Sequence, residues 1–406
     1  APYEAYGKDY KAQMSDFKSG PTEITSHSMP APNVIGGLSI GNRFWNDRLG
    51  VIFAGSVQNT FRGTERTYNA VKMASGEQAM YISSLKRRYY SIHDLTTGLH
   101  AKIDFTLDNH KIEWYNMFVR TNSKSVRYNQ SIGTEYIGTD TYTMDDETRS
   151  MEQTQSIVAS NLKGTHRLTR DFTVDWSAIF SQAKAEDPDR TYLTLTNTMQ
   201  AAAASTAASS SSVSTATDVD VLSGSIWSSD NTVLKTLPKS MERRYQHNKD
   251  TDWAGYVNLS YDTHFGNKVD ALWKAGAQYR RKERSNRYYS YVFNPADISQ
   301  QLEGNGFDQF SAINWTCKTP YSQASQLNYN SKEHIGAAYF MLTMKSTLGE
   351  LNVGFRAEHT NQRYTMLQHF RNMGQVGEQS YWDYLPSASL KWTPTKNMNV
   401  RLSYYL

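Results

Sequence analysis

The chain has 406 residues, of which 38% are hydrophobic and 13% are aromatic, and 27 of them are tyrosines. This composition favours β-strands over helices. The near balance of 43 basic and 39 acidic residues gives no sign of the basic surface that nucleic-acid binding requires. Cys317 is the single cysteine, which excludes an internal disulfide and a cysteine-rich zinc site, and we expect it to be an isolated thiol in a loop.

The sequence contains no apolar run of the roughly 18 residues that a transmembrane helix needs. A membrane barrel is not excluded, because barrel strands hide their apolar half in alternation. The chain opens on Ala1-Pro2 without an initiator Met or an apolar signal region, which indicates either a removed leader or an internal fragment. Residues 1–32 are polar and rich in turn formers, so we expect a loop that leads into the first strand.

The stretch 33–60 predicts the first β-hairpin. In its second arm Val51 and Phe53 fall on one face, while Ser56 and Gln58 fall on the other, and this period of two is typical of a strand. A short connection with an Asn-Asp pair joins the two arms, as in a tight hairpin turn.

Five further hairpins repeat this pattern, so about twelve strands are expected. The polar face carries His100, Lys102 and Asp104 in the second hairpin and Arg356 and Glu358 in the fifth. The paired arms are residues 99–107 with 111–119, 155–164 with 171–181, 253–261 with 269–279, 334–343 with 351–360, and 384–392 with 400–404.

Long polar connections separate the hairpins, over residues 61–82, 121–150, about 197–248 and 284–330. The third contains an alanine- and serine-rich low-complexity tract, which we expect to be mobile, although its alanine run is able to form a local helix. Short turns that alternate with long connections are typical of an outer-membrane β-barrel, which has short periplasmic turns and long extracellular loops.

Aromatic residues cluster beside the short turns, as in the interfacial girdles of membrane proteins. They are Phe44, Trp45, Trp114, Trp176, Trp273 and Trp392. In a barrel, the five polar-face residues named above face the lumen. A soluble sheet protein with one face in a core predicts the same alternation, but it does not predict loop lengths sorted by side. We therefore predict an all-β, antiparallel transmembrane barrel in the bacterial outer membrane.

The orientation of the hairpins also bears on completeness. The first strand leads into a short turn and the last strand leaves one, so both outer ends lie on the extracellular side. Complete barrels of this class have both termini in the periplasm. We therefore expect at least one further strand before Asn33 and one after Leu406, because open edges in lipid expose unpaired backbone groups.

Four stretches, 39–44, 48–51, 58–63 and 384–394, resemble the barrel region of TonB-dependent outer-membrane receptors, especially those of Bacteroidetes-type bacteria. The resemblance implies a barrel of about 22 strands, of which residues 33–406 are a part. It also implies an N-terminal plug domain and energy supplied through TonB. Neither a plug nor a TonB-contacting segment is recognisable in this sequence, so both are expected of the full-length parent.

The function predicted from this resemblance is nutrient uptake, with a small-molecule, glycan or peptide ligand bound by the extracellular loops and with a surface lipoprotein as a further partner. The alternatives are a passive porin and a soluble β-rich binding protein. No HExxH, Walker A or GxSxG motif occurs, so an enzyme is not predicted, and no cofactor or metal site is expected. The acidic pairs Asp187/Asp189 and Asp218/Asp220 are interpreted as solvated loop charge rather than calcium ligands.

Two basic and aromatic runs lie at extracellular strand ends. Their cations are candidates for pairing with lipopolysaccharide phosphates, and their tyrosines for stacking on a sugar or an aromatic chelate. The alternative is a solvated strand extension held by cross-strand aromatic pairs. The residues concerned are Arg280, Arg281, Arg284, Arg287, Tyr289 and Tyr291 in the first run and Lys86, Arg87 and Arg88 in the second.

Overall fold

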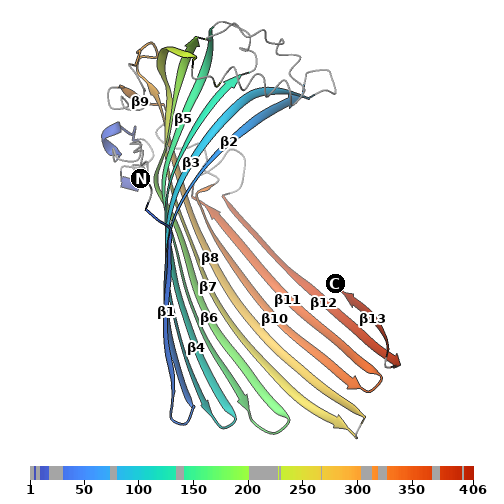
Figure 1. The fold of residues 1–406 in the computed structure, drawn as a ribbon. Helices are drawn as coiled ribbons and strands as arrows, with labels where there is room; N and C mark the ends of the chain where they lie inside the picture. Colours follow the sequence, from blue (N-terminus) through green and yellow to red (C-terminus); the bar gives the residue numbers. More distant parts are fainter. Residues whose placement is uncertain are drawn as a thin grey trace.

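The computed structural model describes residues 4–5, 10–17, 31–73, 80–133, 141–200, 227, 230–266, 268–302, 313–318, 327–367, 375–395 and 397–406. These residues form one antiparallel sheet of 13 strands (Figure 1). The strands are β1 (Val34–Phe44), β2 (Leu49–Met73), β3 (Met80–Leu107), β4 (His110–Gly133), β5 (Thr141–Arg167), β6 (Phe172–Gln200), β7 (Thr232–Phe265), β8 (Val269–Pro295), β9 (Trp315–Cys317), β10 (Tyr329–Ser346), β11 (Gly349–Met366), β12 (Val376–Thr395) and β13 (Met398–Tyr405).

Strands that follow one another in the chain are neighbours in the sheet, from β1 to β13. The short strand β9 is the exception, because it pairs with β8 beside the main path, and β10 takes the next place along. This up-and-down order confirms the all-β, antiparallel prediction and the six hairpins. No helix among the described residues is long and apolar enough to cross a membrane.

The hairpin of β1 and β2 has the predicted tight turn. Phe44 pairs with Leu49, and the three residues between the strands that have positive φ are Trp45, Asn46 and Asp47. Asn and Asp tolerate this left-handed conformation better than other residues with a side chain. The adjacent Arg43 guanidinium donates a hydrogen bond of 2.7 Å to the Asp47 carbonyl oxygen, which closes the turn.

The strands are much longer than predicted. β6 has 29 residues and β7 has 34, whereas a barrel strand crosses the hydrocarbon with about 9–11. Every described residue of the expected loops at 61–82 and 121–150 is strand, and so are the flanks 197–200 and 232–248 of the expected loop at 197–248. In the expected loop at 284–330, β8 continues to Pro295, β9 adds three residues and β10 begins at Tyr329. Most of that loop, with its alanine-serine tract and Asp218/Asp220, lies outside the described residues.

One face of the sheet carries an exposed apolar belt near the short turns. Soluble monomers rarely expose a contiguous apolar patch of more than a few hundred Å², so this face is the one that meets lipid. On β8 the belt runs from Val269 to Tyr279, which matches the span needed to cross the hydrocarbon. Its exposed large side chains include Phe53, Val57, Leu99, Trp114, Leu162, Trp253, Val257, Leu259, Tyr261, Tyr279, Phe340, Val353, Phe355, Tyr384 and Trp392.

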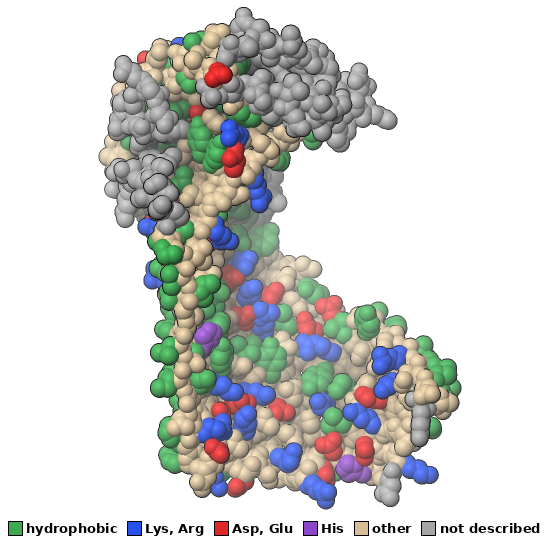
Figure 2. All heavy atoms as spheres, in the orientation of Figure 1, with side chains coloured by type: hydrophobic (Ala, Val, Ile, Leu, Met, Phe, Trp, Pro, Cys, Tyr) green, Lys and Arg blue, Asp and Glu red, His purple; other side chains and the backbone are tan. Residues whose placement is uncertain are grey.

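The opposite face is concave and polar. Figure 2 looks into it and shows basic and acidic side chains scattered over its lower part, while hydrophobic side chains line the outer edge on the left. The two faces alternate residue by residue along each strand. The predicted alternation is therefore confirmed, with the polar set turned away from the belt.

Beyond the belt, the outward face of β6–β8 is covered by a small hydrophobic cluster. Tyr291 and Phe293 are fully buried there, and the Phe17 ring packs edge-on against both, with ring centroids 5.4 Å away. Phe17 follows a single 3-10 turn at Met14–Asp16, so part of the expected N-terminal loop packs against the sheet. Cys317 lies in β9 beside this cluster rather than in a loop.

Candidate functional site

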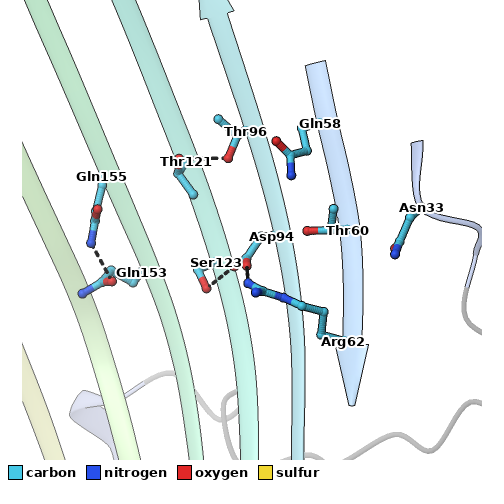
Figure 3. Close-up of a pocket in the computed structure, with 10 residues that line it drawn as sticks. All are labelled: Asn33, Gln58, Thr60, Arg62, Asp94, Thr96, Thr121, Ser123, Gln153 and Gln155. Carbon is cyan, nitrogen blue, oxygen red and sulfur yellow. Dashed lines mark hydrogen bonds and ion pairs between the residues drawn. The ribbon is translucent and has the colours of Figure 1, made fainter. Parts of the chain in front are cut away.

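A polar hollow of about 410 Å³ lies on the concave face, where β2 to β5 run side by side (Figure 3). Every lining side chain is polar, so the hollow suits water or a hydroxyl-rich solute rather than an apolar ligand. The lining residues are Asn33, Gln58, Thr60, Arg62, Asp94, Thr96, Thr121, Ser123, Gln153 and Gln155.

Hydrogen bonds organise the centre of this hollow. Asp94 accepts one bond from Arg62 and one from Ser123, each 2.6 Å long, so its charge is compensated. Thr96 and Thr121 pair through their hydroxyls at 3.0 Å. Figure 3 shows these side chains reaching toward one another across three strands. The amide and hydroxyl groups around them offer both donors and acceptors to a bound solute.

The five residues predicted to face the lumen lie on the concave face, and most of them are paired there. Lys102 contacts Glu113 at 2.8 Å, and Asp104 accepts a 3.0 Å bond from Arg43. His100 lies 2.8 Å from the Tyr115 hydroxyl. On β11, Arg356 contacts Glu358 at 2.6 Å and the Gln278 side chain at 3.0 Å. These contacts compensate most of the named charges within the wall.

The basic run on β8 divides between the two faces. Arg280 pairs with Asp252, and Arg284 forms a bidentate pair with Asp250 at 2.7 and 2.6 Å, both on the concave side. Arg281 points outward and contacts Glu283 at 2.6 Å, directly opposite Trp253 at the end of the belt.

Arg287 is half-buried and donates hydrogen bonds to the Tyr329 carbonyl and the Asn330 side chain at 3.1 and 3.0 Å. Tyr289 and Tyr291 depart most from expectation. Their side chains are only 4% and 0% exposed, inside the Phe17 cluster, so they do not offer a stacking surface to an external ligand. The hydrophobic cover brought by the loop segments explains this burial, and the local sequence does not reveal it.

The second basic run is also split by strand alternation. Arg87 faces outward and contacts Glu65 at 2.6 Å. Lys86 and Arg88 take the other face, where Lys86 lies 6.0 Å from the Tyr68 ring centroid and Arg88 donates a 2.7 Å bond to Asn129. Only alternate members of each run therefore share a surface.

The acidic pair Asp187/Asp189 is not solvated loop charge. The two side chains are only 4% and 6% exposed, and they flank a bulge in β6 between Asp187 and Arg190. Asp187 pairs with Arg190, whereas Asp189 pairs with the buried Arg243. Because each carboxylate is held by its own arginine, the pair does not form a calcium site. The described residues contain no group of three potential metal ligands.

Four arginines that the sequence reasoning missed meet on the concave face beyond the belt: Arg127 on β4, Arg149 on β5, Arg190 on β6 and Arg244 on β7. In the cross-strand register, Arg127 is opposite Arg149 and Arg190 is opposite Arg244. If cross-strand partners are assigned by counting residues outward from the hairpin turns, the result comes close to the observed register. It does not match it, because bulges in the β5–β6 and β6–β7 pairings shift the partners.

Part of the chain is similar to a known protein family. Residues 226–406 match the model of the outer membrane protein beta-barrel family. No curated protein matches the chain.

Among solved structures, the siderophore receptor PiuA from Acinetobacter baumannii is 12% identical with a TM-score of 0.47, over 94% of this chain and 50% of that one. The closed form of the ferric-catecholate import receptor Fiu from E. coli K12 is 12% identical with a TM-score of 0.43, over 92% and 50%. This chain thus spans about half the length of either receptor. The apolar belt and the all-antiparallel sheet are those of an outer-membrane β-barrel wall, and residues 226–406, a little less than half of the chain, are similar to the outer membrane protein beta-barrel family.

Proposed function

We propose that this chain supplies barrel wall to a TonB-dependent nutrient receptor of the Bacteroidetes type, which binds its ligand on the extracellular side and imports it past a plug. One observation carries the proposal. The strands continue far beyond the belt on the side of the long connections, and there the concave face holds a polar hollow and a cluster of arginines. A tall polar wall on this side suits ligand capture, because it surrounds a solute before it reaches the membrane.

A passive pore is the competing function, because the paired charges of the lower concave face also suit a water-filled channel. The two functions differ in their need for energy. A receptor driven through TonB concentrates its ligand inside the cell, whereas a pore only equilibrates it. TonB, a plug domain and a surface lipoprotein are the partners that the receptor proposal requires of the full-length protein.

The test measures uptake by cells that carry or lack the gene for the full-length protein. The labelled probes are a ferric catecholate, a cobalamin, an oligosaccharide and an oligopeptide. We expect one probe to accumulate above its external concentration only when the gene is present, and a protonophore or loss of TonB to abolish this accumulation. Gene-dependent uptake that persists without TonB and stops at equilibrium would identify a pore, and unchanged uptake of every probe would refute the receptor.

A further inference from the structure

The four arginines Arg127, Arg149, Arg190 and Arg244, called here the arginine cluster, form an arrangement that a sheet does not favour. Like charges directly opposite each other, about 5 Å apart at Cβ, destabilise an antiparallel pair. The cluster contains two such pairs side by side, Arg127 with Arg149 and Arg190 with Arg244. The repulsion between these arginines destabilises the sheet unless nearby negative charge compensates it.

Carboxylates in the wall compensate three of the four cations. Glu147 contacts Arg127, Asp187 contacts Arg190, and Glu242 forms a bidentate pair with Arg244 at 2.7 Å for each bond. Arg149 forms no ion pair with any carboxylate in the described part of the chain. The cluster therefore keeps one positive charge in excess.

Arg149 also lies in the least favourable position for an unpaired cation. Burial, followed by the repulsion from Arg127 and Arg190, lowers the pKa of its guanidinium. Its Nε atom is buried without a hydrogen-bond partner, and the same holds for Nε of Arg127 and of Arg190. The Nε–H groups of three guanidinium groups thus lack an acceptor within the described wall, while Arg149 also interacts with Tyr192. An anion that enters between the guanidinium groups would supply this acceptor.

The protonation states of the groups beside the arginine cluster are determined by burial and hydrogen bonding. Burial of Glu242 opposes its ionisation, but hydrogen bonds from Arg244 and Ser290 outweigh it and lower the pKa of this carboxyl. The Arg244 guanidinium also lies 4.4 Å from the centroid of the Tyr192 ring. Burial raises the pKa of Tyr288, so that its hydroxyl stays a neutral donor.

The cluster and the polar hollow belong to one surface. On β4, Arg127 follows Ser123 by four positions on the same face, and on β5 Arg149 precedes Gln153 by the same interval. Four positions along a strand correspond to about 13 Å. A solute with an anionic group and a hydroxyl- or amide-rich body can therefore contact both parts at once.

We propose that the arginine cluster binds an oxyanion, a carboxylate or phosphate group, with Arg149 and Arg190 as its main contacts. The planar guanidinium donates two parallel hydrogen bonds to such groups, which a halide cannot accept in the same way. If the bound anion belongs to the imported nutrient, that identification rests on the proposed function. The binding itself does not, because it is measured on the isolated protein without energy or TonB.

The experiment titrates the detergent-solubilised full-length protein with citrate and with pyrophosphate at constant ionic strength, followed by calorimetry. We expect both anions to bind, and Arg149→Gln and Arg190→Gln each to weaken binding at least tenfold. Arg356→Gln is the matched control, because this arginine lies on the same face of distant β11 and should change affinity less than twofold. A heat-modifiable gel shift verifies that each variant is folded.

A second arm titrates purified lipopolysaccharide, whose phosphates offer the same chemistry from a lipid. Binding of the soluble anions that depends on Arg149 supports the site and a free ligand. Binding of lipopolysaccharide alone that depends on Arg149 supports the site and assigns it to lipid phosphate. The inference is overturned if folded Arg149→Gln binds every probe as the unmodified protein does, or if the unmodified protein binds none.

Discussion

The two halves of β8 differ in what determines their side chains, which is the surrounding solvent in one half and tertiary contacts in the other. From Val269 to Tyr279 the outward residues form part of the apolar belt, while on the inward face Asp270 contacts His264 and Gln278 contacts Arg356. From Arg281 to Pro295 the outward face is charged at first and is then buried beneath the Phe17 cluster. The lower half is determined by its solvent, lipid on one side and water on the other. The upper half is determined by tertiary contacts.

The largest effect of a substitution is expected in the upper half of the strands. Arg243 is fully buried and donates a 2.7 Å bond from Nε to Asp189. Arg243→Met leaves that carboxylate buried without its partner, which costs roughly 3–5 kcal/mol. Hydrogen exchange should show lost protection in the upper parts of β6–β8 and unchanged protection near the short turns.

The control for this variant is Arg87→Met, which removes an exposed ion pair with Glu65 on the outward face. Such pairs contribute roughly 0–1 kcal/mol, so the exchange pattern should hardly change. If Arg243→Met reduced protection in the belt as much as in the upper strands, the two halves would unfold as one cooperative unit, contrary to this account.

A charge placed in the belt should have the next largest effect. Val257 lies in the middle of the belt on β7 and is exposed. Val257→Arg is expected to destabilise the folded protein in bilayers by about 2–4 kcal/mol, because the guanidinium must sit in hydrocarbon. Denaturant unfolding in lipid vesicles measures this difference.

The matched substitution is Val233→Arg, at an equally exposed valine near the far end of the same strand. We expect a change within about 0.5 kcal/mol there, since that end lies in water. Equal penalties at the two valines would contradict a belt that is confined to the lower half.

The smallest effect concerns the charge of the arginine cluster. Burial, against the attraction of Arg190 and more distantly of Arg149 and Arg244, raises the pKa of Asp187 above its ordinary 3.8. As pH falls from neutrality toward that raised value, Asp187 loses its charge and frees Arg190. Sulfate affinity should therefore rise several-fold, because sulfate keeps its own charge over this range.

Asp187→Asn imitates the uncharged state, so it should bind sulfate more tightly at neutral pH and lose most of the pH dependence. Calorimetric titrations at several pH values measure both quantities. An affinity that is lower in Asp187→Asn, or that falls with pH in the unmodified protein, would show that Asp187 does not restrain the cluster.

The belt and the turns were predictable because their physics is local. The alternation that contains Phe53 and Val57 is enough to predict an apolar face that meets lipid. The pair Asn46-Asp47 is enough to predict a turn with left-handed backbone conformation. The upper strands were not predictable in this way. They lie outside the lipid, so their sequence does not need to alternate between apolar and polar residues. Backbone pairing nevertheless continues, as in β6, where alternate threonines from Thr194 to Thr198 suit a strand.

The candidate site was less predictable than the fold. Tyr289 and Tyr291 looked like ligand contacts because nothing in their neighbourhood reveals that Phe17 covers them. The arginine cluster was not predictable from the sequence because its members come from four strands that are far apart in the chain. The bulge that ends at Arg190 also shifts the cross-strand register that would align these residues.

The most direct test of the membrane arrangement compares two adjacent positions on β7 in lipid vesicles. Spin labels are attached to Val257→Cys and to Tyr256→Cys in a Cys317→Ser background, and their accessibility to oxygen and to a water-soluble nickel chelate is measured. At position 257 we predict high accessibility to oxygen and low accessibility to nickel, with the reverse at 256, because alternation puts the first on the belt and the second on the concave face. Equal nickel accessibility at both positions would contradict a membrane-spanning sheet.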